Sequence, residues 1–297
     1  MWEPAFVKRE QVAAAREGRG FEVSASGLWV CGDLSALARP CVAVVGTRAA
    51  TPYGRGLAYQ FAAGLGAAGC CIVSGLALGI DAAAHEGALS CRAPTLGVLG
   101  GGHRRFFPKR NRGLAERMLC SGGAVLSPYP PDQLAHPHQF LQRNGIVAAL
   151  ADAVLVIEAP ARSGALNTAS WAAGRIPVLA VPGDVDRRHV QGCLALIRDG
   201  ATLARTPSDV LEALGRLPLP PSLEAFGEPR DPAAQALLDA LEAGASEFDE
   251  LVCASGVAPA AALAQLALLE LDGSIESRGP STYARVGRAS RGEVQRG

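Results

Sequence analysis

The fold is decided by the stretch Pro40–Asp81, which reads PCVAVVGTRAATPYGRGLAYQFAAGLGAAGCCIVSGLALGID. Its first apolar run, Cys41–Val45, lies between a proline and a glycine and predicts a buried strand. Thr51 and Pro52 suit the N-cap and the first position of a helix, because the missing N–H of proline needs no partner there. Gly69 ends that helix, and another apolar run and another helix start follow. The stretch therefore predicts two successive strand–loop–helix units.

The turn Gly46-Thr47-Arg48 separates the first strand from its helix, and Ser74-Gly75 follows the second strand. A glycine turn before a helix start exposes backbone N–H groups, and Arg48 adds a planar guanidinium that suits a phosphate. The first turn is not a G-x-G-x-x-G pattern, and no acidic residue follows the second strand to bind a ribose. We therefore expect an anion-binding edge and not a dinucleotide site.

Strand and helix signals alternate as far as residue 214. They predict an α/β fold with an extended Rossmann-like, mainly parallel sheet flanked by helices. Ligands of such sheets bind at the carboxyl ends of the strands, where most glycines, prolines and polar residues of this segment fall. The expected strands are 41–45, 71–73, 95–99, 124–126, 153–157, 178–181 and 201–203. The expected helices are 51–68, 81–90, 111–120, 143–150, 164–174, 190–198 and 207–214.

Composition divides the rest of the chain around this segment. In the lead-in we expect a helix near 11–16 and a strand near 28–31, at the edge of the sheet. Three helices, expected at 232–243, 247–254 and 259–271, and a hairpin around Gly279-Pro280 predict a small C-terminal winged-helix-like domain. The expected segments are a lead-in at 1–40, the Rossmann-like domain at 41–214, a proline-rich linker at 215–230, the winged-helix-like domain at 231–287 and a disordered basic tail at 288–297.

Charge is unevenly placed, although 28 Lys and Arg balance 28 Asp and Glu overall. Residues 41–214 carry 16 basic and 11 acidic side chains, a net charge of +5, whereas residues 231–286 carry 2 and 9, a net charge of −7. The two parts should therefore bind different partners. The third C-terminal helix has no Lys or Arg, which argues against insertion into a DNA major groove and favours a protein contact.

The eight cysteines show no C-x-x-C pair and lie mostly in apolar runs. They predict reduced thiols of a cytoplasmic protein, and no disulfide or zinc framework. The N-terminus has no apolar signal region. Residues 57–80 are uncharged, but five glycines there predict a helix, a turn and a strand rather than a membrane span. We expect neither a membrane nor a metal ion as partner.

The densest basic cluster is 103–112, where five Arg and Lys flank Phe106 and Phe107. Interleaved cations and rings suit single-stranded nucleic acid, because cations bind phosphates while bases stack on the rings. The alternative is an exposed charged loop that its two phenylalanines anchor to the core.

Two smaller clusters have the same chemistry. Phe140, Arg143 and Asn144 begin a helix, and Arg162 and Ser163 lie at a strand-to-helix turn. A ring, guanidinium groups and an amide at helix starts suit a nucleotide. The His-x-His pair just before Phe140 has no third ligand of suitable spacing, so it does not predict a metal site.

Some polar residues have both a catalytic and a structural interpretation. Glu158 suits a general base, or a carboxylate that fixes its loop through backbone N–H groups. Asp81 and His85 suit an acid–base pair, or an N-cap and a hydrogen bond within the loop layer. We favour the structural interpretation in each case, because no nucleophile or leaving group is apparent. Trp171 is expected in the core.

The ordered motifs resemble the DNA-processing protein A family (DprA, also called Smf), over roughly residues 28–214. The matching stretches are Val42–Arg48, Thr51–Gly54, Ser74–Ala77, Gly79–Asp81, Ala84-His85, Gly97–Gly102, Phe107-Pro108, Asn111, Ser127, Tyr129-Pro130, Phe140, Arg143-Asn144, Glu158-Ala159, Ser163–Ala169, Gly174-Arg175 and Val181–Gly183. The family often has Arg where this chain has Leu78 and Gly145, and both differences remove a phosphate partner.

The resemblance implies a protein that binds and protects incoming single-stranded DNA, forms a homodimer and helps to load RecA recombinase during natural transformation. It implies neither enzymatic activity nor a cofactor. Together with the clusters it implies that the DNA contacts are Gly46, Thr47, Arg48, Ser74, Gly75, Lys109, Arg110, Arg112, Phe140, Arg143, Asn144, Arg162, Ser163 and Gly164.

Two alternatives remain at this point. A nucleotide phosphoribohydrolase of the lysine-decarboxylase-like group has a related fold, but its catalytic Glu is missing here, near Trp171. A regulator that binds duplex DNA through residues 231–286 would need a basic third helix, which this chain lacks.

Overall fold

The computed structural model describes residues 3–17, 19, 22, 25–216, 231–271, 275–277, 279 and 281–285. The chain divides into two units, Met1–Phe226 and Gly227–Gly297. Almost all of the expected linker and the whole expected basic tail lie outside the described residues. The five segment boundaries stay predictions.

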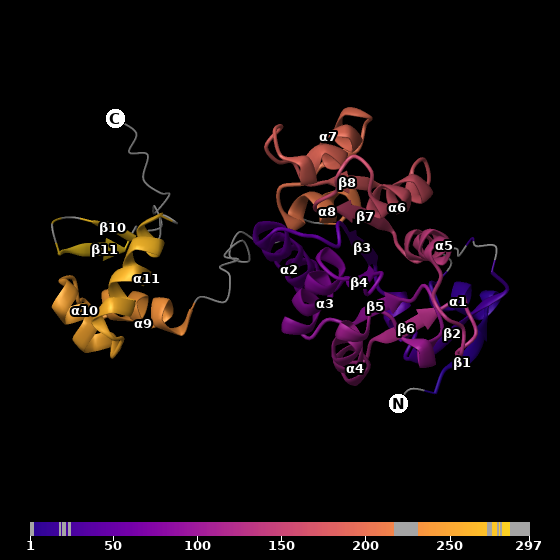
Figure 1. The fold of residues 1–297 in the computed structure, drawn as a ribbon, viewed down its shortest axis with the longest axis horizontal. Helices are drawn as coiled ribbons and strands as arrows, with labels where there is room; N and C mark the ends of the chain where they lie inside the picture. The colour runs from indigo at the N-terminus through magenta and orange to yellow at the C-terminus, as the bar shows by residue number, and fades with distance from the viewer. Residues whose placement is uncertain are drawn as a thin grey trace, which may run out of the picture. The chain divides into compact units, whose positions relative to one another are not determined.

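A nine-stranded sheet runs through the larger unit in the order β1-β2-β6-β5-β4-β3-β7-β8-β9 (Figure 1). The pairs from β6 to β9 along this order are parallel, whereas β2 joins β6 and β1 joins β2 antiparallel. This confirms the expected mainly parallel sheet with the lead-in at its edge, and adds β1. The strands are β1 Ala5–Lys8, β2 Gly27–Gly32, β3 Cys41–Val45, β4 Cys71–Ser74, β5 Thr95–Val98, β6 Ala124–Ser127, β7 Ala153–Val156, β8 Val178–Ala180 and β9 Thr202–Leu203.

Strand β3 is buried on both faces, which explains its continuous apolar sequence. Val42 and Val44 pack with residues of α2, α3 and α8, while Ala43 and Val45 pack with residues of α1, α5, α6 and α7 on the other face. Helix α4 covers the first face beside α3. The helices are α1 Arg9–Ala15, α2 Pro52–Ala67, α3 Ile80–Ser90, α4 Arg112–Cys120, α5 Pro137–Ala149, α6 Gly164–Ala172, α7 Gln191–Arg198 and α8 Pro207–Ala213, with 3-10 turns η1 Ser35–Ala38, η2 His103–Arg105, η3 Lys109–Asn111 and η4 Arg188–Val190.

Helix α5 begins earlier than the expected 143–150. Pro137 occupies its first turn, and the Gln139 side chain accepts a hydrogen bond from the backbone N–H of His136 at 2.6 Å. A proline and a capping side chain define this start. The expected range omitted this first turn because it is polar and lacks the apolar period of a helix, although Phe140 was expected at a helix start.

Asp152, just before β7, ties the lead-in to the amino edge of the sheet. Its carboxylate accepts hydrogen bonds from the guanidinium of Arg16 at 2.9 Å, from Arg19, and from the backbone N–H of Cys41 at 2.7 Å. Arg16 is 2% exposed and also donates to the carbonyl oxygen of Leu150. This buried ion pair holds α1 against the start of β3 and β7.

We expect Asp152→Ala to lower the free energy of unfolding by about 3 kcal/mol, because Arg16 would keep a buried charge without its carboxylate. Urea unfolding followed by far-UV circular dichroism measures the loss. Asp199→Ala is the matched control, since Asp199 pairs with Arg198 on the surface and should change stability by less than about 1 kcal/mol. Equal losses in the two variants would contradict the assignment.

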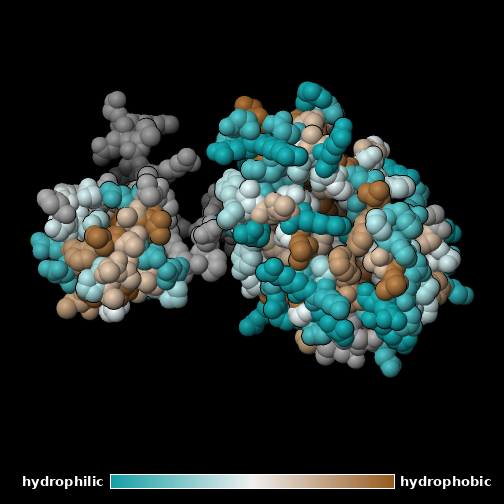
Figure 2. All heavy atoms as spheres, viewed as in Figure 1, coloured by the Kyte–Doolittle hydropathy of each residue, from teal (hydrophilic) through white to brown (hydrophobic). Residues whose placement is uncertain are grey.

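The described residues of the smaller unit form three helices followed by a two-stranded hairpin, which confirms the expected winged helix. Its core contains Leu237, Leu251 and Leu266. Leu263 and Leu268 of the third helix are 59% and 57% exposed, and Figure 2 shows apolar residues over this helix. The elements are α9 Pro232–Glu242, α10 Phe248–Ser255, α11 Pro259–Leu271, β10 Ile275–Ser277 and β11 Tyr283–Arg285.

Residues 57–80 contain most of α2, a turn and β4, which confirms the expected helix, turn and strand, and they end at the first residue of α3. Within the described ranges no single helix has the length and apolarity to cross a bilayer, and α10 with α11 meets that test only as a pair bent by 110°. All eight cysteines are free thiols.

Candidate nucleic-acid interface

A groove lies at the carboxyl edge of the parallel strands, where β3 has β4 on one side and β7 on the other. Open α/β sheets bind ligands at such a reversal of strand order. Its volume of about 1400 Å³ exceeds the roughly 300–1,000 Å³ of pockets for small ligands, so it suits an extended ligand. Among the described residues, Asp81 is the one acidic residue that lines it. The cationic lining residues are Arg48, Arg104, Arg105, Lys109, Arg112, Arg143 and Arg162.

The groove brings together all but two of the expected site residues. The turns after β3 and β4, the loop before α4, the first turns of α5 and the start of α6 supply them. The expected residues that line it are Gly46, Thr47, Arg48, Gly75, Lys109, Arg112, Phe140, Arg143, Asn144, Arg162, Ser163 and Gly164.

Ser74 and Arg110 do not line the groove. Ser74 ends β4 and is fully buried, and its hydroxyl donates to a carbonyl oxygen of β3 at 2.6 Å, so the expectation that it faces a ligand is wrong. Arg110 lies in the middle of η3. Residues three apart share one side of a 3-10 turn, so Lys109 and Arg112 face the groove together while Arg110 points elsewhere.

Thr51 caps α2 as expected, and its hydroxyl accepts a hydrogen bond from the N–H of Gly54 at 2.9 Å. Glu158, which follows β7, accepts hydrogen bonds from the backbone N–H and the hydroxyl of Thr51 at 3.0 and 2.6 Å. The carboxylate therefore fixes two neighbouring loops. This confirms the structural interpretation of Glu158 over that of a general base.

Asp81 does not cap α3, contrary to expectation. Gly79 is the N-cap, and its φ of 82° is a conformation that favours glycine. Asp81 lies in the first turn, and its carboxylate accepts hydrogen bonds from the N–H groups of Gly75 and Ala77 at 3.0 and 3.3 Å. It thereby folds the turn after β4 back onto the helix start.

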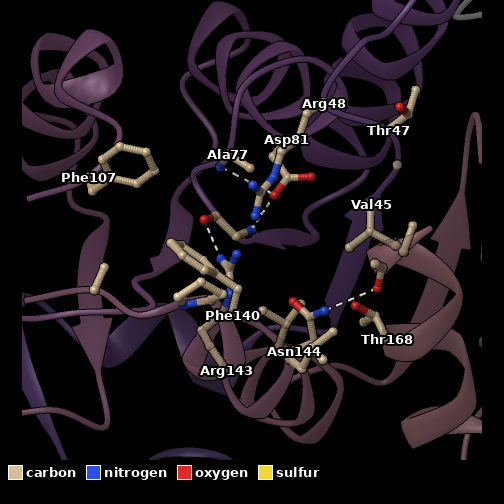
Figure 3. A pocket seen from close by; sticks show the side chains of 18 of the residues that line it. Val45, Thr47, Arg48, Ala77, Asp81, Phe107, Phe140, Arg143, Asn144 and Thr168 are labelled. Atoms are coloured by element: carbon tan, nitrogen blue, oxygen red, sulfur yellow. Dashed lines mark hydrogen bonds between the residues drawn. The ribbon is translucent and has the colours of Figure 1, made fainter. Parts of the chain in front are cut away.

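Arg143 approaches the same turn from below the groove. Its guanidinium donates to the carbonyl oxygen of Gly75 and to that of Val98 at 2.6 Å, and the side chain is only 3% exposed. A Cβ at Gly75 would lie 2.0 Å from Arg143 Nη1, so any side chain at position 75 would force the guanidinium to move. Arg143, expected among the DNA contacts, is almost fully buried and supports the floor of the groove (Figure 3).

Burial sets the charge balance of this floor. It raises the pKa of the Asp81 carboxyl, and the positive charge of Arg143 opposes that rise. Burial also lowers the pKa of Arg143, to about 10, so the guanidinium remains charged at neutral pH. Asp81, the Gly75 peptide and Arg143 form one chain of hydrogen bonds under the cationic lining.

We expect Arg143→Ala to reduce the free energy of unfolding by about 3–5 kcal/mol, because it leaves Asp81 and two carbonyl oxygens without compensation. Thermal unfolding of the full chain measures the change. Arg162→Ala, at an exposed arginine of the same groove, should change stability by less than about 0.5 kcal/mol. If Arg143→Ala were as stable as Arg162→Ala, Arg143 would not be a structural residue.

His85 of α3 is fully buried beside this floor. Its Nδ1 lies 2.7 Å from Thr95 Oγ1, and the Thr95 hydroxyl itself donates to the carbonyl oxygen of Ile72. Nδ1 therefore carries the proton and donates to Thr95, which leaves Nε2 as a buried acceptor without a partner among the described residues. Burial, reinforced by Arg143, lowers the pKa of His85 to about 3. The expected structural hydrogen bond of His85 is confirmed, but its partner is the first residue of β5 and not a residue of the loop layer.

The depressed pKa of His85 predicts acid sensitivity. The imidazole has a pKa of about 6.5 in the unfolded chain, so between pH 6.5 and 3 it binds a proton there but not in the folded protein. The free energy of unfolding therefore falls as the pH decreases from 6.5 toward 3. We expect the wild type to lose up to about 1.4 kcal/mol per pH unit more than His85→Gln between pH 6 and 4. Urea unfolding at each pH measures both, and parallel pH profiles would refute the assignment.

The basic cluster contains one buried and one exposed ring. Phe106 is 5% exposed and anchors the loop, whereas Phe107 is 53% exposed and lines the groove. The ring centroids of Phe107 and Phe140 lie 6.0 Å apart with a tilt of 59°, and the Arg48 guanidinium lies 5.0 Å from the centre of Phe140 (Figure 3). Phe106 thus anchors the loop, whereas Phe107 is exposed to the groove, and base stacking on it stays a prediction.

The start of α6 forms the opposite side of the groove. Asn144 donates to the carbonyl oxygen of Gly164 at 3.0 Å. The Ser163 hydroxyl caps α6 by accepting a hydrogen bond from the backbone N–H of Ala165. Trp171 is 51% exposed, so its expected place in the core is wrong. Its indole packs against Gly145 of α5, where a Cβ would approach the ring to 3.2 Å. The absence of a side chain at Gly145 leaves room for the indole.

Sequence reasoning missed the apolar part of the lining. Leu134 and Leu141 are largely exposed and line the groove beside the two rings. Leu134 lies in an irregular loop with no periodic signal, and Leu141 resembles any apolar helix residue. Arg104 and Arg105, noted only as part of the basic cluster, also line the groove.

Comparison with known proteins adds to this geometry. The family described as DNA recombination-mediator protein A matches residues 19–215, and the DprA winged helix domain matches residues 220–279. The chain belongs to the DprA family. The chain is 41% identical over 264 residues to a putative DNA processing protein DprA of Mycobacterium tuberculosis (84% of this chain, 66% of the relative). The DprA of Bacillus subtilis is 34% identical over 190 residues (63% of each chain).

Two solved DprA structures share the fold. DprA from Streptococcus pneumoniae has a TM-score of 0.60 at 38% identity, covering 64% of this chain and 66% of that one. DprA from Helicobacter pylori, whose structure concerns a single-stranded DNA binding mode, has a TM-score of 0.61 at 26% identity, covering 71% and 95%. The chain spans at most about two thirds of the length of the curated DprA relatives described here.

Proposed function

We propose that the groove binds single-stranded DNA and that the protein is a recombination mediator rather than an enzyme. The observation that carries this proposal is the gathering of Arg48, Lys109, Arg162 and Phe140 in one open groove at the carboxyl edge of the sheet. Cations that bind phosphates and rings that stack with bases are the two elements of single-strand recognition. Membership of the DprA family supports the same function.

Separate groups in the groove would bind the phosphates and the bases. Arg48, Arg105 and Arg162 are exposed and have no ion pair within the described part of the chain, so their guanidinium groups are available to phosphates. Arg104 and Arg112 pair with Asp132 and Glu116 on the surface, and such exposed pairs exchange readily. The apolar lining beside Phe107 and Phe140 is where unstacked bases would lie.

The two alternatives have weaker support. A nucleotide phosphoribohydrolase needs an available carboxylate, but Asp81 and Glu158 are bound to backbone N–H groups. A regulator of duplex DNA would present a basic third helix, but the exposed side of α11 carries Leu263 and Leu268. Single-strand binding in the groove of the larger unit is therefore better supported than either alternative.

We expect Arg48→Ala to weaken binding of a thymidine oligomer by about 10- to 100-fold, the cost of losing a charge-assisted hydrogen bond. The slope of log Kd against log salt should fall by about 0.7, because one phosphate contact is lost. Fluorescence anisotropy at several salt concentrations measures both quantities.

Arg110→Ala is the control for that measurement, since Arg110 has the same charge but lies outside the groove. It should change the affinity much less than Arg48→Ala. Equal losses would mean that net charge, and not the groove, binds the DNA. Duplex DNA of the same length should bind the wild type more weakly, because its bases are not free to stack.

The proposed partners follow from the family. We propose that the protein acts as a homodimer in the cytoplasm, protects incoming single strands and helps to load RecA recombinase on them during natural transformation. Light scattering tests the dimer. RecA filament assembly on strands coated with a single-strand-binding protein, with and without Arg48→Ala, tests the loading.

A further inference from the structure

Arg48 and Phe140, both assigned to ligand binding above, contact each other in the free protein. The Arg48 guanidinium carbon lies 5.0 Å from the centre of the Phe140 ring, within the distance of a cation–π interaction. The Arg48 side chain is exposed and has no ion pair within the described residues. The ring is therefore its principal partner in the absence of ligand.

The other surroundings of Phe140 leave little room for a base. The ring lies against Gly100, where a Cβ would come within 2.7–3.3 Å of three ring atoms. Phe107 is next to it, tilted by 59°. A base held between two rings needs them parallel, and this pair is not parallel. The face under Arg48 is thus the place where a base would stack.

We propose that Arg48 and Phe140 form a latch that selects ligands carrying a phosphate and a base together. This inference rests on the proposed binding of single-stranded DNA. In the free protein Arg48 covers the ring of Phe140. On binding, Arg48 moves to a phosphate, and a base takes its place on the ring.

The latch would act on specificity. A polyanion without bases releases Arg48 but leaves the ring without a partner, and a free base meets a covered ring. A single strand supplies a phosphate to Arg48 and a base to the Phe140 ring, so each side chain regains a partner. Phe107 is already exposed, and no cation covers its ring within the described part of the chain, so it would accept a base without any change.

A double-mutant cycle tests the latch, with Arg48→Ala, Phe140→Leu and the double variant measured for affinity to a thymidine oligomer. Each single variant loses one contact to DNA but no longer has to open the latch. The double variant should therefore weaken binding about two- to fivefold more than the product of the single effects, which corresponds to one cation–π contact. Simple multiplication of the effects, or a smaller combined effect, would overturn the latch.

The matched control combines Phe140→Leu with Arg162→Ala. Arg162 is another exposed arginine of the groove, but no ring contact engages it within the described residues. The effects of these two substitutions should multiply. The same excess in this cycle would attribute the coupling to the groove in general and would overturn the latch.

An oligomer of abasic sites gives a second and opposite expectation. It offers phosphates but no bases, so Phe140→Leu loses nothing and gains the freed Arg48. The variant should bind the abasic oligomer about two- to fivefold more tightly than the wild type. Unchanged or weaker binding would contradict the proposal. Phe140→Met replaces Phe140→Leu if circular dichroism shows that the latter is not folded.

The outcomes separate the latch from the proposed function. If the wild type binds neither oligomer, the function is wrong and the latch with it. If the wild type binds the thymidine oligomer but the Arg48 and Phe140 effects simply multiply, only the latch is wrong.

Discussion

The groove depends on one peptide group that is bound from both sides. The N–H of Gly75 donates to Asp81, and its carbonyl oxygen accepts from Arg143. Both charged groups are buried, so each needs the other and the intervening peptide to offset the cost of leaving water. This constraint fixes the turn after β4 between the start of α3 and the body of α5. The exposed cations of the groove are arranged above it.

The parallel sheet explains why residues from five loops meet. Strands β3, β4, β5 and β7 end at the same edge, and the order reverses at β3, so the loops after β3 and β7 diverge and leave a hollow. Continuous apolar runs such as Cys41–Val45 identify buried strands in the sequence. The edge, the helix starts at Thr51 and Ser163, and the clustering of Arg48 with Phe140 were therefore predictable from local patterns.

What could not be predicted is the direction of individual side chains. Arg143 and Arg162 look alike in the sequence, yet α5 packs against the sheet and directs Arg143 inward, while Arg162 precedes α6 and stays exposed. Trp171 packs on the surface against Gly145 of another helix and stays half exposed. Asp81 is not a cap because the turn before α3 folds back onto it. Each outcome depends on contacts between segments far apart in the chain.

The bond between Glu158 and Thr51 has a consequence for how the protein meets its ligand. It joins the loop after β7 to the first turn of α2, across the point where the strand order reverses. The loop after β7 and the start of α2 are thereby held in a fixed relative position. The conformational entropy of ordering them is lost during folding rather than during ligand binding. Adaptation to ligands of different shape then falls to the long side chains at the rim, which reorient on the nanosecond scale without any hinge.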